Sequence, residues 1–228
     1  MDTAQGVMTS VGITQGSGIE FKERVKALMN KYNIDGLLEE KEDLGGEDLE
    51  SSLRRQGMPQ RIIETLRDMK ETKATDAINS FLLTDREAWC LVLAGPKGCG
   101  KSTAAGRFLS EITKPKVRSP PKNTRWWTSS RISRVSGYDS HLEKIMRERV
   151  IVIDDLGVEY LDKNGYFSHR LDELIDERYS NYRKTVITTN LNAKDFQARY
   201  GARVADRIRE GFKHGGAYVE IDMGSLRA

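Results

Sequence analysis

The sequence of 228 residues predicts an α/β domain in which a parallel sheet carries helices on both faces. Five short runs rich in apolar and β-branched residues predict strands at residues 90–95, 125–130, 149–155, 185–190 and 217–222. The segments between the first four runs are long enough for the crossovers that parallel strands need. A glycine-rich turn follows the first run directly, and a helical segment follows the turn.

Composition favours one globular domain with a small extension. The chain is 38% hydrophobic and 31% charged, which is enough to bury one core. It contains no run of about 18 apolar residues and no basic leader followed by an apolar stretch, so we expect a cytoplasmic protein with no membrane span. Cys90 and Cys99 are the two cysteines, which excludes a disulfide framework and a zinc-stabilised N-terminal domain.

The N-terminal part has its own character. Residues 1–19 are rich in Gly, Ser and Thr and predict a mobile tail, and residues 21–32 have the apolar spacing of an amphipathic helix. This helix either docks on a partner or folds back on the core. Residues 45–50 favour a linker, and residues 57–83 favour a turn followed by a helix. We therefore divide the chain into an extension, 1–57, and a core domain, 58–228.

The net charge of +3 conceals two segments of opposite sign. Residues 35–50 hold eight acids and one lysine, whereas residues 114–134 hold seven cations and no acid. The second segment also contains adjacent tryptophans, a mixture typical of single-stranded nucleic acid binding. The tryptophans lie in a predicted strand, so at least one should point into the core. The arginines of this segment are therefore candidate DNA contacts.

The segment GPKGCGKS matches the full spacing of a phosphate-binding loop. Its glycines let backbone N–H groups turn toward phosphate oxygens, and the helix that follows directs its positive end to the same place. Lys101 is expected to reach the β and γ phosphates of ATP, and the Ser102 hydroxyl to bind Mg²⁺. The expected nucleotide contacts are Gly95, Pro96, Lys97, Gly98, Cys99, Gly100, Lys101, Ser102 and Thr103.

Polar residues end two further predicted strands. In RVIVIDDLG the strand delivers Asp154 and Asp155 to the carboxyl edge of the sheet, where such sheets bind ligands. We expect Asp154 to hold Mg²⁺ and Asp155 to orient or deprotonate the attacking water. Asn190 ends the strand TVITTN, where it would contact the γ-phosphate or that water.

Arginines follow at helical spacing near the C-terminus. In the stretch around YGARVADRIREG, Arg199, Arg203 and Arg207 are four residues apart, so a helix would place them on one side. By itself such a charge run is usually a solvated face. The question is therefore which negative charge, if any, these guanidinium groups contact.

Taken in order, GPKGCGKS, VIVIDDLG, DELIDERYSNYRKTVITTN and GARVADRIREG resemble the AAA+ ATPases of the DnaC and IstB group. These are helicase loaders of bacteria and phages and helper ATPases of one transposon family. The resemblance covers residues 58–228 and implies a P-loop NTPase core with a five-stranded parallel sheet. Because 18 residues follow Glu210, it also implies that the full helical lid of larger AAA+ proteins is missing.

The resemblance implies roles for single residues. Lys101 and Ser102 match Walker A, Asp154 and Asp155 match Walker B, and Asn190 matches sensor 1. Arg207 matches the arginine finger, with Arg203 as the alternative, and Arg227 matches sensor 2. Many AAA+ proteins have Glu where this chain has Asp155, which leaves the hydrolysis rate open.

The resemblance implies a Mg²⁺-dependent ATPase that loads a replicative helicase onto DNA. It would form a homo-oligomer on ATP, bind single-stranded DNA and release its partner after hydrolysis. In similar initiators and loaders the part after the second strand touches single-stranded DNA, so the resemblance implies DNA contacts at Arg131 and Arg134, followed by Lys122 and Arg125. The alternative is a transposition helper ATPase that binds DNA and stimulates a transposase. A third class, a P-loop kinase acting on a small molecule, gives no joint role to Asn190, Arg207 and Arg227. The sequence leaves open the partner, the subunit number and the choice of finger.

Overall fold

The computed structural model describes residues 48–114, 123–134, 140–159, 165–222 and 224. The chain divides into two compact units, residues 1–42 and residues 43–228, and all the described residues belong to the second. The tail and helix expected before residue 42 lie outside the described residues, as do Lys122 and Arg227. Among the helices that the structure describes, none has the length and hydropathy needed to cross a membrane.

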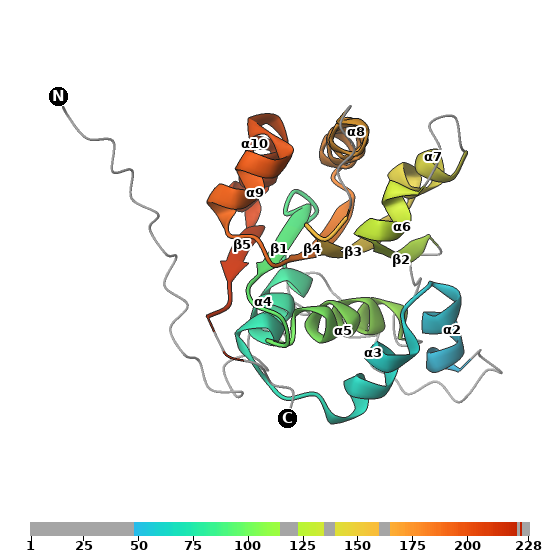
Figure 1. Cartoon of the computed structure of the whole chain (residues 1–228). Coiled ribbons are helices and arrows are strands. Elements are labelled where there is room, and N and C mark those ends of the chain that lie inside the picture. The colour runs from blue at the N-terminus through green and yellow to red at the C-terminus, as the bar shows by residue number, and fades with distance from the viewer. Residues whose placement is uncertain (1–47, 115–122, 135–139, 160–164, 223, 225–228) are drawn as a thin grey trace. The chain divides into compact units, whose positions relative to one another are not determined.

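Five parallel strands form the central sheet, as the sequence predicts (Figure 1). They lie side by side in the order β2-β3-β4-β1-β5. Because β1 lies between β4 and β5, the phosphate loop that follows it lies at the carboxyl ends of the strands, next to the end of β4. The strands are β1 (Cys90–Ala94), β2 (Thr124–Thr128), β3 (Val150–Leu156), β4 (Lys184–Thr189) and β5 (Ala217–Glu220).

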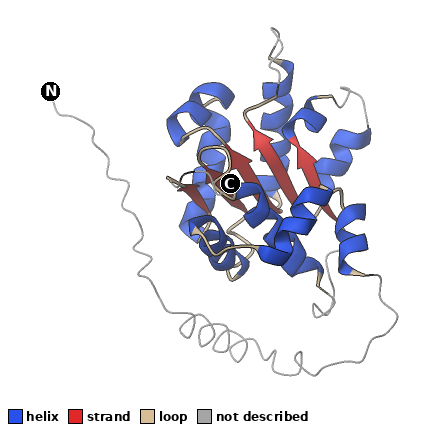
Figure 2. Cartoon of the chain, turned by 60° about the horizontal axis from the view of Figure 1, so that its bottom comes forward, coloured by secondary structure: helices blue, strands red, loops and turns tan. Residues whose placement is uncertain are grey.

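Helices cover both faces of the sheet (Figures 1 and 2). One face carries α2 (Leu49–Arg55), α3 (Gln60–Thr65), the short 3-10 helix η2 (Leu66–Asp68), α4 (Lys73–Leu82) and α5 (Lys101–Thr113). The other carries α6 (Ser129–Ser133), α7 (Ser140–Arg147), α8 (Tyr166–Ser180), α9 (Ala193–Tyr200), α10 (Ala202–Glu210) and the 3-10 turn η3 (Gly211–His214). Each layer has its own buried apolar cluster against the sheet.

The two adjacent tryptophans of β2 enter opposite layers. Trp126 is 2% exposed and packs in the layer of α5, whereas Trp127 is 9% exposed and packs in the layer of α8. This follows from the period of two along a strand. Because both rings are buried, neither is available to stack on a nucleic-acid base.

The compact unit begins before the expected boundary at residues 57 and 58. Leu53 of α2 is buried in the core cluster that contains Phe108 and Leu109 of α5. The backbone N–H of Trp126 donates to the carbonyl of Gln56 at 2.9 Å, so this segment also pairs with the edge strand β2. Residues 49–57 are therefore part of the core.

Two expected helices are interrupted. Residues 57–83 form α3, η2 and α4 rather than one helix, because Met69 is extended and Thr72 caps α4 in a reciprocal pair with Thr75. The arginine helix is also divided, since Gly201 has a φ of 91° between α9 and α10. Arg199 therefore lies on a different helix from Arg203 and Arg207.

A fully buried arginine fixes the end of α7. The guanidinium of Arg178 donates to the carbonyls of Glu148 at 2.7 Å and Ile145 at 3.2 Å, and to the Thr185 hydroxyl at 2.8 Å. Burial lowers the pKa of Arg178 to about 9. Carbonyls at the end of a helix carry partial negative charge, so this cation of α8 holds the end of α7 beside β4.

Candidate nucleotide-binding site

The phosphate loop joins β1 to α5, and its glycines adopt conformations that other residues rarely adopt. The φ angles of Gly95, Gly98 and Gly100 are 151°, 86° and 90°. A Cβ on Gly95 would lie 2.5 Å from the carbonyl oxygen of Ile221, so this position has room only for glycine. Gly100 precedes the first residue of α5, whose N-terminus therefore points its free N–H groups at the loop.

Lys101 lies across the loop and links it to β4. Its ammonium donates hydrogen bonds of 2.7 Å to the carbonyls of Gly95 and Pro96 and one of 3.2 Å to Oδ1 of Asn190. Only 5% of the lysine is exposed. The structure thus brings the loop and the first turn of α5, which are contiguous in the sequence, to the end of β4, which lies far along the chain.

Asp154 is the buried carboxylate of the site. Its Oδ1 accepts hydrogen bonds from the Ser102 hydroxyl at 2.8 Å and from the Thr188 hydroxyl at 2.6 Å. Burial raises the pKa of Asp154, and the neighbouring Asp155 carboxylate raises it further, while the two hydroxyl donors oppose the shift. Asp154 and Ser102, which the sequence assigns to one metal site, are therefore direct neighbours.

Asp155 lies in a bulge of β3 and points to solvent. The register between β3 and β4 shifts between Ile153 and Leu156, so one extra residue is accommodated there. Asp155 has a φ of 56°, a left-handed conformation that is uncommon for a non-glycine residue. Its N–H donates to the Thr188 hydroxyl at 2.9 Å, and its carbonyl accepts from Ser129 at 2.7 Å. These bonds hold an exposed carboxylate next to the buried one.

The residues present fit the expected ATP and Mg²⁺. The loop supplies backbone N–H groups and a helix N-terminus for phosphate, and Lys101 supplies the cation. The Ser102 hydroxyl and the Asp154 carboxylate are hard oxygen donors, the ligands that Mg²⁺ prefers, and they lie 2.8 Å apart. No rearrangement of the strands is needed to bring these groups to one place.

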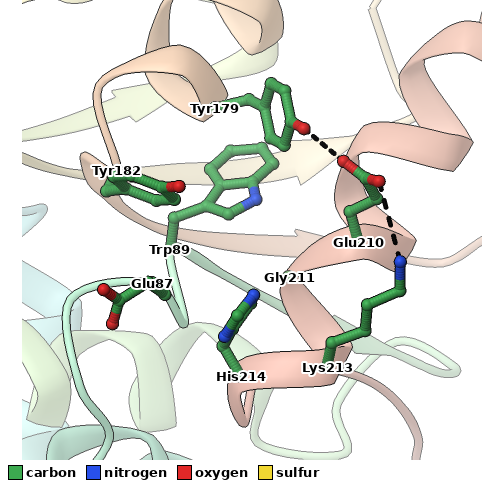
Figure 3. Close-up of a pocket in the computed structure, with 8 residues that line it drawn as sticks. All are labelled: Glu87, Trp89, Tyr179, Tyr182, Glu210, Gly211, Lys213 and His214. Carbon is green, nitrogen blue, oxygen red and sulfur yellow. Dashed lines mark hydrogen bonds and ion pairs between the residues drawn. The ribbon is translucent and has the colours of Figure 1, made fainter.

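A separate pocket lies at the other end of β1 (Figure 3). The pocket lies at Trp89, the residue directly before β1, whereas the phosphate loop begins directly after β1. Its volume is about 100 Å³, below the roughly 300 Å³ at which small-molecule sites begin. Tyr179 donates a hydrogen bond to Glu210 at its rim. The pocket is lined by Glu87, Trp89, Tyr179, Tyr182, Glu210, Gly211, Lys213 and His214, and it is not the nucleotide site.

Each arginine of the C-terminal series contacts an acid of this same chain. Arg207 pairs with Asp172 at 3.0 Å and Asp176 at 2.5 Å, both on α8, and Arg203 pairs with the same two acids. Arg199 pairs with Glu159 at 2.9 Å. The expectation that the arginines form a solvated helix face is therefore wrong for Arg207, whose side chain is 17% exposed.

Glu159 connects the end of β3 to α9. Its side chain is fully buried and accepts from the Gly157 N–H at 2.7 Å, from the Tyr200 hydroxyl at 2.6 Å and from Arg199. Burial alone would raise the pKa of Glu159, but these donors outweigh burial and hold it below its usual value. The network joins the loop after Asp155 to the helix before α10.

The expected DNA contacts divide into two groups. Arg131 is exposed on α6 and Arg134 is exposed directly after the last residue of that helix, and the guanidinium of Arg131 lies 4.8 Å from the ring centre of Trp127. Arg125 is bound within the chain, to the carbonyl of Arg55 at 2.6 Å and to Glu148 at 3.4 Å. Lys122 lies outside the described residues.

Sequence reasoning missed five residues of this region. Thr188 is visible only as a β-branched residue of a strand, and Ser129 as a polar residue after one. Asp172 and Asp176 repeat the spacing of four that Arg203 and Arg207 have, and this matching period was the available signal. For Glu159 no comparable signal exists, because its partners come from α9.

Comparison with known proteins gives one family and several solved structures of similar fold. The family model for IstB-like ATP binding proteins matches residues 47–228. The crystal structure of the DnaC helicase loader is similar with a TM-score of 0.55 and 20% identity, covering 72% of this chain and 100% of that chain. The crystal structure of DnaI gives 0.54 and 20%, covering 76% of this chain and 100% of that chain.

AMPPCP-bound DnaA from Aquifex aeolicus has a TM-score of 0.55 at 12% identity, over 73% of this chain and 52% of that chain. At these identities the structures show a shared fold, that of the AAA+ ATPase core. Comparison with curated protein sequences gave no significant match.

Proposed function

The chain belongs to the IstB-like ATP-binding family, and its fold is similar to that of the DnaC helicase loader. From these two likenesses we propose that it is an ATP-dependent loader of a replicative DNA helicase. In this proposal it hydrolyses ATP with Mg²⁺, assembles with copies of itself on ATP and binds single-stranded DNA. Hydrolysis then releases the partner. The part of the extension that precedes α2 would carry the partner contact.

The observation that carries the proposal is the convergence of three strand ends. Lys101 begins α5 after the loop that follows β1, Asp154 lies in β3 and Asn190 follows β4. Two hydrogen bonds join these segments, Lys101 to Asn190 and Ser102 to Asp154. Binding of ATP without hydrolysis needs only the phosphate loop. Hydrolysis also needs a group beside the γ-phosphate, and Asp155 and Asn190 lie at that edge.

Each residue has a stated task in this proposal. When bound, ATP and Mg²⁺ supply the phosphoryl group and the charge that neutralises it. Lys101 would exchange the carbonyls of Gly95 and Pro96 for phosphate oxygens, and Ser102 and Asp154 would hold the metal. Asp155 orients the attacking water from its exposed position in the bulge. Asn190 would contact the γ-phosphate and so detect whether it is present. Its existing contact with Lys101 supports this role.

Arg207 is the proposed finger toward the site of a neighbouring copy. It lies on α10, and its ion pairs in this chain are with α8 rather than with the phosphate loop. A cation that stabilises transferring phosphate from a second subunit makes turnover depend on assembly. Arg227 is proposed as a second cation at the nucleotide, from the resemblance alone.

Single-stranded DNA is proposed to contact α6. Arg131 and Arg134 are exposed there, and phosphate contacts by such side chains make binding depend steeply on salt. Arg125 is kept in the proposal as a weaker contact, since it would first have to leave Glu148 and Arg55.

A second function is favoured by the family itself. IstB-like proteins give the family its name, so a transposition helper that binds DNA and stimulates a transposase remains the alternative. The ATPase core serves both, and the DNA partner separates them. A loader should prefer single strands, whereas a helper that wraps DNA should prefer duplex.

The test is ATP hydrolysis by the full chain over a range of protein concentrations, with single-stranded DNA, with duplex or without DNA. We expect turnover to rise more than linearly with concentration and to be stimulated more by single strands. Arg207→Ala should lower turnover by about a thousandfold at saturating ATP. Lys101→Ala, which removes the phosphate-binding cation, is the control for contaminating ATPases.

Two results would change the assignment. Stimulation by duplex but not by single strands favours the transposition helper. Turnover that is linear in concentration and survives Arg207→Ala rejects the shared site, and with it the finger.

A further inference from the structure

Two pairs of charged residues face each other between α8 and α10 in a matched lattice. Asp172 and Asp176 are one helical turn apart on α8, and Arg203 and Arg207 are one turn apart on α10. Each arginine pairs with both aspartates, which makes four ion pairs of 2.5–3.1 Å. Two positive charges are thus balanced by two negative charges within one chain.

The two arginines use different oxygen atoms of the same carboxylates. Arg207 contacts Oδ1 of Asp172 and Oδ1 of Asp176, whereas Arg203 contacts Oδ2 of each. Neither arginine therefore depends on the other for its own contacts. If one leaves, the other still holds both aspartates.

The exposure of the two side chains differs in the same lattice. The Arg207 side chain is 17% exposed and that of Arg203 is 63% exposed, while Asp172 and Asp176 are 21% and 38% exposed. If Arg203 were absent, moving Arg207 away from α8 would leave two partly buried carboxylates beside each other without a counterion. Such unpaired like charges are unfavourable, so Arg203 lowers the free energy of releasing Arg207.

We propose that Arg203 is a positioning residue, the counterion that retains Asp172 and Asp176 when Arg207 turns toward the triphosphate of a neighbouring copy. The inference rests on the proposed function, in which Arg207 acts between subunits. In this role Arg203 never touches nucleotide. Asp172 and Asp176 hold the finger within its own chain until a phosphate group competes for it.

The proposal predicts a rescue. Arg203→Ala should impair turnover because Arg207 is then held by two carboxylates that nothing else neutralises. Replacing both carboxylates with amides, Asp172→Asn with Asp176→Asn, removes the charge that holds Arg207. The amides should therefore restore turnover to Arg203→Ala, whereas they cannot restore it to Arg207→Ala.

The experiment measures ATP turnover of the full chain against protein concentration for these variants. We expect Arg203→Ala to lower maximal turnover on the order of tenfold, the size of typical coupling between ion-paired neighbours. The triple variant should return to within about threefold of the wild type. Affinity for a fluorescent ATP analogue should stay unchanged in all of them, and thermal unfolding confirms that each variant is folded.

Arg209→Ala is the matched control. Arg209 lies on α10 as well, its side chain is 56% exposed, and its ion pair is with Asp206 on its own helix. It should leave turnover within about twofold of the wild type, since surface pairs of this kind contribute little.

Three results are decisive. Arg203→Ala without effect overturns the inference, and so does a loss that the two amides fail to rescue, because Arg203 would then act on phosphate itself. Wild-type turnover that is linear in concentration and survives Arg207→Ala rejects the proposed function instead. The two failures are therefore distinguishable.

Discussion

The hydroxyl of Thr188 donates a 2.6 Å hydrogen bond to Oδ1 of Asp154 and accepts one of 2.9 Å from the N–H of Asp155. One side chain of β4 thus orients both acids of β3. This contact stabilises the bulge that exposes Asp155. The backbone of Asp155 is left-handed there, and its N–H nevertheless keeps a hydrogen-bond partner.

Thr188→Val keeps the shape of the side chain but removes both bonds. We expect a loss of about 2 kcal/mol in the free energy of unfolding, because a buried carboxylate loses a donor and an N–H loses its acceptor. Turnover should fall about tenfold because Asp155 is no longer held in its position, whereas ATP affinity should change little. Urea unfolding and steady-state kinetics measure these quantities. Thr188→Ser, which keeps the hydroxyl, should restore most of the turnover.

Asp154 and Asp155 should separate in their response to Mg²⁺. Asp155→Asn should lower kcat by at least about a hundredfold while leaving the Mg²⁺ dependence unchanged, because a water-orienting group acts in the transition state. Asp154→Asn should instead shift the Mg²⁺ titration to higher concentrations. Equal shifts for both variants would contradict the division of tasks.

The raised pKa of Asp154 gives that titration a pH dependence. Burial and the adjacent Asp155 raise this pKa, so a proton competes with Mg²⁺ for the carboxylate over a higher pH range than at a solvated aspartate. Half-saturation by Mg²⁺ should therefore need more metal as the pH falls toward that range. A titration by fluorescent nucleotide binding at several pH values tests this. Asp154→Asn should lose this pH dependence, and an unchanged pH dependence in that variant would count against Asp154 as the ligand.

Glu159 should link stability to acid pH. Its pKa lies below the usual value of 4.5, because donors from Tyr200, Gly157 and Arg199 outweigh burial. A carboxylate with a depressed folded pKa stabilises the fold above its unfolded pKa, and this contribution disappears as the pH falls through the folded pKa.

Glu159→Gln should therefore cost about 2 kcal/mol at pH 7, and the difference from wild type should shrink below about pH 4.5. Urea unfolding between pH 7 and pH 3.5 measures this difference. Glu173→Gln, at an exposed position of α8, is the control and should show no such convergence.

Arginines of α6 should contribute to DNA affinity more than Arg125 does. Arg131→Ala with Arg134→Ala should lower single-strand affinity and reduce the slope of log K against log salt by about 1.4, at about 0.7 for each lost contact. Arg125→Ala should change affinity less, since Arg125 is bound to Arg55 and Glu148. Fluorescence anisotropy across salt concentrations compares them, and an equal loss in both variants would reject the preference for α6.

Local chemistry made much of this protein predictable. The phosphate loop was predictable because its glycines stand where the backbone adopts conformations that other residues rarely adopt. The five strands were predictable from runs of β-branched residues. Asp154 and Asn190 were expected at one edge because parallel strands end together, and the structure places Lys101 and Ser102 beside them. The period of two also required at least one tryptophan of β2 to be buried, and both are.

Only the tertiary structure decided which charges meet. Arg203 and Arg207 have the spacing of a solvated face, and nothing local says that α10 packs against α8 with Asp172 and Asp176 at the same spacing. Glu159 finds Arg199 and Tyr200 across forty residues of chain in the same way. The physical reason is that a sequence fixes backbone preference and period within each element, whereas contacts between elements depend on the order of the sheet strands that carry them.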